Sequence, residues 1–286
     1  MKKIILLMAV TLLALYIVLS ILGSGGEYGA EKLFYRALKL NSVIARNPDV
    51  APPKLLSDVE NTLKKILVKY PKTNVAMTAN MTLAEFYIRH KRYDDALSKL
   101  DAIIKAYDKN QSMLSTAHFL KGRVYERQGY WQKALKEYAI VRDNYTETEL
   151  GLQVPLVIAK YYVDNGRDAD AKQAYNDAVT FYGGLEKKNH KKMLGYIASK
   201  LLIQTYMFME DYEKASSVIE ETIYNYPSQM TLMQLLPQME ILIVKKLKQP
   251  ERAVGIYKKI REMSKDEKLN KFLDKKIEEL VHKKVS

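Results

Sequence analysis

The sequence predicts an all-α protein: about six helix pairs in series, closed by one further helix and preceded by one apolar helix. Three observations predict it. A small residue recurs every 37 to 44 residues, apolar side chains recur with a period near 3.6, and no segment alternates apolar and polar residues as a strand does. With 48% hydrophobic and 28% charged residues, the composition fits a folded chain rather than a disordered one.

The N-terminal segment, residues 1–22, predicts a membrane anchor. Lys2 and Lys3 precede nineteen uncharged residues, 4–22. A helix of that length covers about 28 Å, close to the thickness of a bilayer core. The two lysines favour a cytoplasmic start, with the rest of the chain outside. The alternative is a cleaved signal peptide, because Gly23 and Gly25 form a small-x-small pattern that a signal peptidase accepts. Residues 23–27 are predicted to be a flexible linker.

The repeat is marked by an alanine near the start of the second helix of each pair, with valine in its place in the first pair. The six marks are Val59, Ala96, Ala134, Ala171, Ala215 and Ala253. Tyrosine stands nine residues before the mark in four units, at Tyr87, Tyr125, Tyr162 and Tyr206. It also stands eleven residues after the mark in five units, at Tyr70, Tyr107, Tyr145, Tyr182 and Tyr226. We expect these tyrosines to fill the space between pairs, with their hydroxyls at the wet edge.

These units resemble the tetratricopeptide repeat (TPR) family across about residues 28–264. The unit that carries the resemblance best runs Thr116, Gly122, Tyr125, Gly129, Trp131, Ala134, Tyr138. The resemblance implies a right-handed α-α superhelix of stacked helix pairs. Units of 37–38 rather than 34 residues, with Tyr-Pro endings at Tyr70 and Tyr226, resemble bacterial envelope members of the family. Residues 265–286 are predicted to be a capping helix, the alternative being an amphipathic helix on a membrane surface.

The resemblance also implies an inner face lined by the first helix of each pair. The predicted partner-binding groove comprises Met81, Glu85, Arg89, Phe119, Arg123, Arg127, Lys160, Lys200, Gln204 and Phe208. This mixture of basic and apolar side chains favours an acidic protein segment with apolar anchors. The alternative is that Glu85 and Arg89 pair at i, i+4 and only solvate their helix.

No catalytic motif stands out, so the sequence predicts a non-enzymatic protein with no cofactor and no metal. Cysteine is absent, and none of the four histidines has a ligand partner at metal-binding spacing. The basic run at 187–192 is interpreted as a solvated surface rather than an anion site. A hydrolase using Glu85 or Glu126 in the groove is an alternative without a supporting residue pair. The net charge of +13 is compatible with nucleic acid, but the predicted export argues against it.

We therefore expect a scaffold or adaptor for protein–protein interactions in cell-envelope assembly or protein export. It would be a single-pass protein of the cell membrane, with its repeats on the periplasmic side and protein or peptide partners. The alternative is a soluble periplasmic binding protein, released by cleavage near Gly25.

Overall fold

The computed structural model of the chain describes residues 26–46 and 51–282. In these ranges the chain forms helices and their connections, and no strand occurs there. The all-α prediction is therefore confirmed for the described part. The predicted anchor or signal segment at 1–22 lies outside the described residues, as do residues 23–25 of the predicted linker. Among the helices that are described, none has a stretch both long and apolar enough to span a membrane.

The chain divides after residue 150 into two compact units. The first contains α2 (Glu27–Arg46), α3 (Pro53–Lys69), α4 (Asn74–Arg89), α5 (Tyr93–Ala106), α6 (Gln111–Arg127) and α7 (Trp131–Asn144). The second contains α8 (Glu149–Asp164), which begins at the division, α9 (Asp168–Lys188), α10 (Met193–Phe208), α11 (Tyr212–Asn225), α12 (Gln229–Met239), the π-helical segment η2 (Glu240–Lys246), α13 (Pro250–Met263) and α14 (Glu267–His282).

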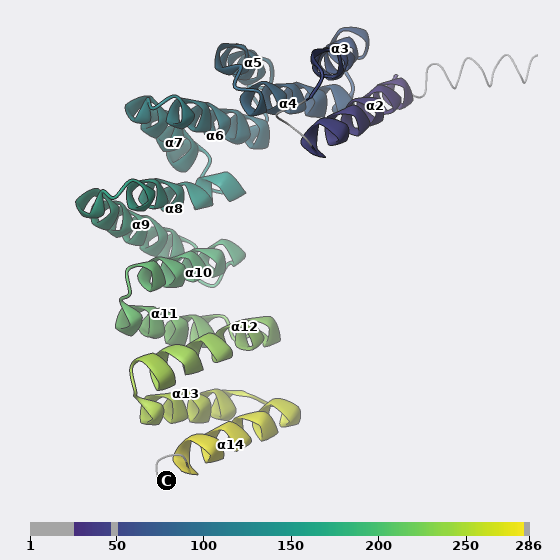
Figure 1. The fold of residues 1–286 in the computed structure, drawn as a ribbon. Helices are drawn as coiled ribbons and strands as arrows, with labels where there is room; N and C mark the ends of the chain where they lie inside the picture. Colours follow the sequence, from purple (N-terminus) through teal and green to yellow (C-terminus); the bar gives the residue numbers. More distant parts are fainter. Residues whose placement is uncertain (1–25, 47–50, 283–286) are drawn as a thin grey trace, which may run out of the picture. The chain divides into compact units, whose positions relative to one another are not determined.

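Most helices that follow one another along the chain pack side by side in each unit (Figure 1). In the first unit α2 packs on α3, α3 on α4, and so on through α7, while α2 also touches α4 and α4 touches α6. In the second unit α9 packs on α10, α10 on α11, α11 on α12 and η2, and α13 on η2 and α14. Because a lone pair cannot bury both of its apolar stripes, each pair depends on the next one for its core.

The six repeat marks lie on the second helix of each pair and are buried. Their exposed fractions are Val59 1%, Ala96 0%, Ala134 0%, Ala171 5%, Ala215 0% and Ala253 0%. A side chain as small as alanine lets two helix backbones approach closely, which explains why five of the six marks are alanine.

In the second to sixth helix pairs, the turn between the two helices places one residue in the left-handed region, five positions before the mark. These residues are Lys91 (φ 58°), Gly129 (φ 78°), Gly166 (φ 65°), Glu210 (φ 57°) and Lys248 (φ 58°). In four of the turns the next N–H donates to the carbonyl of the tyrosine that precedes the mark by nine residues. These bonds are Arg92 to Tyr87 (2.9 Å), Tyr130 to Tyr125 (2.8 Å), Arg167 to Tyr162 (2.9 Å) and Asp211 to Tyr206 (3.0 Å). The repeated tyrosine is thus the residue whose carbonyl closes the first helix.

The longest repeat interval is explained by one long helix. Tyr70, Tyr107, Tyr145 and Tyr226 each follow the last residue of a second helix. By contrast, Tyr182 lies inside α9, which has 21 residues where α5, α7 and α11 have 14. The basic run at 187–192 therefore begins at the C-terminal end of a helix, where cations interact favourably with the helix dipole.

The expectation that the repeated tyrosine hydroxyls reach water is wrong at Tyr182, and two further tyrosines, Tyr138 and Tyr257, are buried in the same way. Tyr138, Tyr182 and Tyr257 are at most 1% exposed. Their hydroxyls donate instead to internal acceptors: Glu126 at 2.7 Å, the Leu152 carbonyl at 2.6 Å, and Glu240 at 3.1 Å, respectively. A buried hydroxyl needs such a partner, because leaving it without one costs about 1–3 kcal/mol.

Candidate partner-binding site

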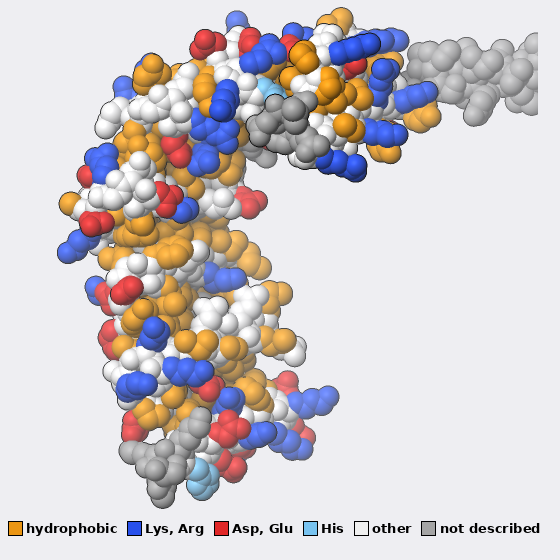
Figure 2. Space-filling view, viewed as in Figure 1, with side chains coloured by type: hydrophobic (Ala, Val, Ile, Leu, Met, Phe, Trp, Pro, Cys, Tyr) orange, Lys and Arg blue, Asp and Glu red, His pale blue; other side chains and the backbone are white. Residues whose placement is uncertain are grey.

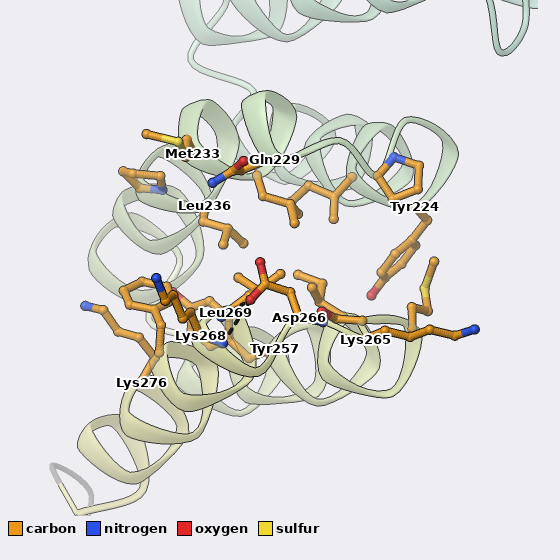
Figure 3. A pocket seen from close by; sticks show the side chains of 18 of the residues that line it. Tyr224, Gln229, Met233, Leu236, Tyr257, Lys265, Asp266, Lys268, Leu269 and Lys276 are labelled. Carbon is orange, nitrogen blue, oxygen red and sulfur yellow. Dashed lines mark hydrogen bonds between the residues drawn. The ribbon is translucent and has the colours of Figure 1, made fainter.

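A candidate site lies in a groove between α12 and α14 in the second unit, which we call the α12–α14 groove. Its cavity volume is about 770 Å³. The ends of α11 and α13 complete its lining. The lining residues are Ile223, Tyr224, Pro227, Gln229, Leu232, Met233, Leu236, Pro237, Glu240, Tyr257, Ile260, Met263, Ser264, Lys265, Asp266, Lys268, Leu269, Phe272 and Lys276. Figure 3 shows Met233 and Leu236 on one wall, facing Leu269 and Tyr257 on the other.

Helix α12 forms one wall because it carries an exposed apolar residue beside its buried ones. Leu232 and Leu236 are at most 6% exposed, whereas Met233 is 71% exposed. The hydroxyl of Ser228 caps the helix by accepting the N–H of Thr231 at 3.1 Å. Methionine at an open position is typical of surfaces that adapt to varied partners, since its side chain is unbranched and flexible.

Pro237 interrupts the hydrogen bonding of this wall. It stands inside α12 and has no N–H, so the carbonyl of Met233 lacks the donor that helix geometry would provide. The chain continues from Met239 into η2, a π-helical segment of seven residues. Both Met233 and Pro237 line the groove.

Helix α14 forms the opposite wall, and its first turn is capped. Asp266 caps it, because the N–H groups of Lys268 and Leu269 donate to Oδ1 of Asp266 at 2.9 and 3.2 Å. Leu273 and Leu280 are the buried residues of α14, which packs on α13. Phe272 lies on the groove and is 45% exposed.

One end of the groove is closed by a polar cluster. Oε2 of Glu240 accepts the hydroxyl of Tyr257 at 3.1 Å and pairs with Nζ of Lys276 at 3.0 Å. The hydrogen bond to Glu240 raises the pKa of Lys276, and burial raises that of Tyr257. At the other end, burial and Glu220 raise the pKa of Tyr224 to about 12. Both tyrosines are thus neutral donors at physiological pH.

The charged side chains on the rim of the groove that are neither ion-paired nor used as a helix cap are lysines. Glu240 is paired and Asp266 is used as a helix cap. Lys265 and Lys268 are exposed and line the groove, and neither forms an ion pair with another described residue. The site can therefore hold an apolar segment that carries an acidic group next to these lysines. In the part of the chain that the structure describes, no group of three His, Asp or Glu residues could hold a metal ion.

In the first unit, α4 and α6 carry six of the residues predicted from the sequence. The two helices touch, and Nη1 of Arg127 donates to the carbonyl of Ile88 at 3.5 Å. Phe119 packs on the ring of Tyr138, with 5.6 Å between centroids. Met81 and Phe119 are half-buried, while Glu85, Arg89 and Arg127 are exposed. The structure therefore brings these residues to adjacent helices with polar groups open to solvent.

The carboxylates of this face differ in their surroundings. Although the Glu85 side chain is exposed, the protein around it removes part of its hydration and raises its pKa, and Arg89 offsets part of the rise. Glu126 is held by Arg123 at 3.2 Å and accepts the Tyr138 hydroxyl. These contacts hold Glu126 in the packing between α6 and α7, and they add no support for the alternative of a hydrolase.

The other four predicted residues belong to the second unit and are all exposed. Lys160 pairs with Asp164 at 2.8 Å along α8, and Lys200 donates to Oε1 of Gln234 at 2.9 Å. The ring of Phe208 lies 6.2 Å from that of Tyr175. Gln204 lies one turn beyond Lys200 on α10. The ten predicted residues thus form separate candidate faces on two units.

The α12–α14 groove was not among the residues predicted from the sequence. Met233 and Phe272 were available as signals, since each is a large apolar side chain outside the buried stripe of its helix. Pro237 was a third signal, because proline inside a helix marks a break in its hydrogen bonds. What the sequence does not show is the space between α12 and α14, which depends on how both pack against α13 and η2.

Comparison with known proteins finds similarity at the level of solved structures. No family model matches the chain, and no curated protein matches it. A tetratricopeptide repeat protein from Parabacteroides merdae is 16% identical with a TM-score of 0.35, over 86% of this chain and 99% of that one. Yeast Tom70 is 11% identical with a TM-score of 0.37, over 90% of this chain and 60% of that one. The TPR domain of P58(IPK) is 15% identical with a TM-score of 0.31, over 90% of this chain and 66% of that one.

Proposed function

We propose that this chain is a membrane-tethered scaffold that binds segments of other proteins in its α12–α14 groove. The observation that carries the proposal is the groove itself: an apolar trough of about 770 Å³ whose uncommitted rim charges are lysines. Such a site fits a segment that inserts apolar side chains and places acidic ones at the rim. The sequence resemblance to the TPR family, and the absence of a catalytic motif in the sequence, support a binding role rather than a catalytic one.

The proposed tether is the uncharged run at residues 4–22. Its length and the two lysines before it support a retained single-pass anchor, with the repeats on the periplasmic side. A scaffold held at a membrane raises the local concentration of the proteins it binds, which suits a role in envelope assembly or export. Intact-mass measurement of the mature protein tests the tether, because cleavage near Gly25 would remove its mass and favour a soluble periplasmic protein.

Binding in the groove is tested with two fluorescent peptides, one of leucine and glutamate and one of leucine and lysine. We expect the full chain to bind the acidic peptide and not the basic one. Met233→Glu should abolish binding, because it places a carboxylate among apolar walls. Met193→Glu is the matched control, since Met193 is 72% exposed and Met233 71%, but Met193 does not line the groove.

The charge of the rim is tested by Lys265→Gln together with Lys268→Gln. Both lysines are exposed, so the fold should be unaffected. Affinity for the acidic peptide should fall and should depend less on salt. Equal binding of the two peptides, or binding unchanged by Met233→Glu, would refute the groove as the site.

A further inference from the structure

A stripe of tyrosine and basic residues runs along the exposed side of α2, the first described helix. It consists of Tyr28, Lys32, Tyr35, Lys39 and Arg46, which we call the α2 stripe. At 3.6 residues per turn, these five residues fall within about 60° of one another around the helix, and they cover about 27 Å of its length. The buried residues Ala30, Ala37 and Ile44 lie on the opposite side. All members of the stripe are exposed.

The tyrosines of the stripe are unusual for the exposed side of a helix. Tyr28 is 72% exposed and Tyr35 is 71% exposed. A helix side that needed only to face water would carry polar side chains. Tyrosine mixed with lysine and arginine is instead typical of the interface between a membrane and water, where the ring reaches the headgroup level and the cation meets phosphate.

The charge around the stripe is positive and largely uncompensated. Residues 26–46 and 51–72 contain nine lysines and arginines against four acidic residues. Two of those four are engaged elsewhere: Glu27 accepts the N–H of Val75 at 3.2 Å, and Glu60 pairs with Lys64 and Arg92. The cations of the stripe form no ion pair with any described residue. Figure 2 shows basic and hydrophobic side chains intermingled over the part of the surface formed by α2 and α3.

We propose that the α2 stripe docks on the headgroups of anionic lipids. This inference depends in part on the proposed tether, because an uncharged run ending at Leu22 within a bilayer would keep α2 near its surface. Five chain steps separate Leu22 from Glu27, so α2 would begin within about 18 Å of the end of the run. The helix then lies along the membrane surface, with the tyrosine rings among the headgroups and Lys32, Lys39 and Arg46 against their phosphates.

The docking is tested on the full chain reconstituted into lipid vesicles. The protein has no cysteine, so Tyr35→Cys gives a single site for a fluorescent label. Tyr130→Cys is the matched control, because Tyr130 is also an exposed tyrosine of the first unit, at 53%. Vesicles of phosphatidylcholine, alone or with phosphatidylglycerol, carry a nitroxide quencher on their headgroups. We expect quenching at position 35 but not at 130, and more of it with phosphatidylglycerol.

The role of charge is tested by Lys32→Gln together with Lys39→Gln. Because a lysine at an anionic surface shifts binding about fivefold, this pair should move the ratio of docked to undocked α2 by roughly 30-fold. Lys187→Gln with Lys188→Gln removes the same charge from the exposed end of α9 and should leave quenching at position 35 unchanged.

The possible outcomes separate this inference from the proposed tether. Protein that stays in the vesicles through alkaline extraction, but with position 35 quenched no more than position 130, would overturn the docking and retain the tether. Protein that is extracted would refute the tether, and adding phosphatidylglycerol vesicles from outside at low salt would then decide the docking. Energy transfer between labels at position 35 of two chains, without lipid quenching, would show that a second copy covers the stripe and would overturn the inference.

Discussion

Arg92 and Glu60 form an ion pair that joins two successive helix pairs of the first unit. Glu60 lies on α3, and Arg92 stands at the start of α5, beyond the turn that follows α4. The hydroxyl of Tyr87 donates to the same carboxylate at 2.9 Å, and the Arg92 guanidinium lies 4.5 Å from the centroid of the Tyr87 ring. The tyrosine that closes α4 with its carbonyl thus also links the pair to its neighbour through its side chain.

This cluster predicts an acid-sensitive contribution to stability. Burial alone would raise the pKa of Glu60, but hydrogen bonds from Arg92, Lys64 and Tyr87 lower it from 4.5 to about 2. The folded state therefore holds the proton less tightly than the unfolded state. The contribution is complete above pH 4.5 and is lost as the pH falls toward 2. Glu60→Gln should cost about 2 kcal/mol near neutral pH and progressively less below pH 4.5.

The measurement is urea unfolding at several pH values, followed by the fluorescence of Trp131, the single tryptophan, which lies in the first unit. Asp143→Asn serves as the control, because its pair with Arg142 joins adjacent residues near the surface of the same unit and contributes little. A loss on Glu60→Gln that is the same at every pH would contradict the assignment.

The turns within the helix pairs give a second prediction, based on backbone conformation alone. Gly129 has a φ of 78°, and a Cβ added there would meet nothing within 4 Å. Gly129→Ala should therefore destabilise the first unit only through backbone strain, by about 1–2 kcal/mol. Lys91 occupies the equivalent position with a φ of 58°, so Lys91→Gly should stabilise by up to about 1 kcal/mol.

The comparison variant for the second change is Lys91→Ala, which removes the same side chain and keeps the strain. Its unfolding midpoint should stay close to that of the parent chain, below that of Lys91→Gly. If Lys91→Ala and Lys91→Gly behave alike, the lysine side chain rather than the turn determines the effect.

These turns show what the sequence reveals and what it does not. Gly129 and Gly166 could be identified as turn residues, because glycine is the residue that adopts positive φ without strain. Lys91, Glu210 and Lys248 adopt the same conformation but carry no such signal. Their role is visible only through their distance from the alanine marks. The helix pairs themselves were predictable, because burial of one stripe per helix makes apolar residues recur with a period near 3.6 along the sequence.

The candidate site could be predicted less well than the fold. The groove residues on α4 and α6 follow from the family resemblance; these two helices touch, and the role of the residues in binding stays a prediction. The α12–α14 groove is built instead from α12 with its internal Pro237, from the π-helical segment after it and from α14, which Asp266 caps. Each of these is a local departure from the repeat, and a repeat pattern predicts only what the units share.

Gly122 gives a prediction about close packing in α6. A Cβ at this position would lie 2.5 Å from Cε1 of Tyr138. The ring cannot easily move, because Tyr138 is fully buried and packs against Phe119 and Trp131. Gly122→Ala should therefore destabilise the first unit by about 1–3 kcal/mol, despite the better helix propensity of alanine.

The matched variant is Gly184→Ala in α9, where the added Cβ meets nothing within 4 Å. It should raise the stability of the second unit by about 0.5–1 kcal/mol, because only the propensity changes. The opposite signs can be checked by calorimetry of the two variants. Gain of stability in both would mean that Tyr138 has room to shift, and that the packing at Gly122 is looser than the structure shows.

The last prediction concerns Glu240, which connects η2 to α13 through Tyr257 and to α14 through Lys276. Glu240→Ala leaves the Tyr257 hydroxyl without its acceptor and Lys276 without its close partner, so it should cost about 2–3 kcal/mol. The loss should appear first at α14, because α14 has only two buried residues, Leu273 and Leu280. Hydrogen exchange of the α14 amides is therefore expected to accelerate more than that of α11.

Glu279→Ala is the control for this prediction. The Glu279 side chain is 47% exposed and lies 3.5 Å from Lys276, farther than Glu240 does. If both variants accelerate α14 exchange equally, the cluster at the end of the α12–α14 groove does not hold that wall in place.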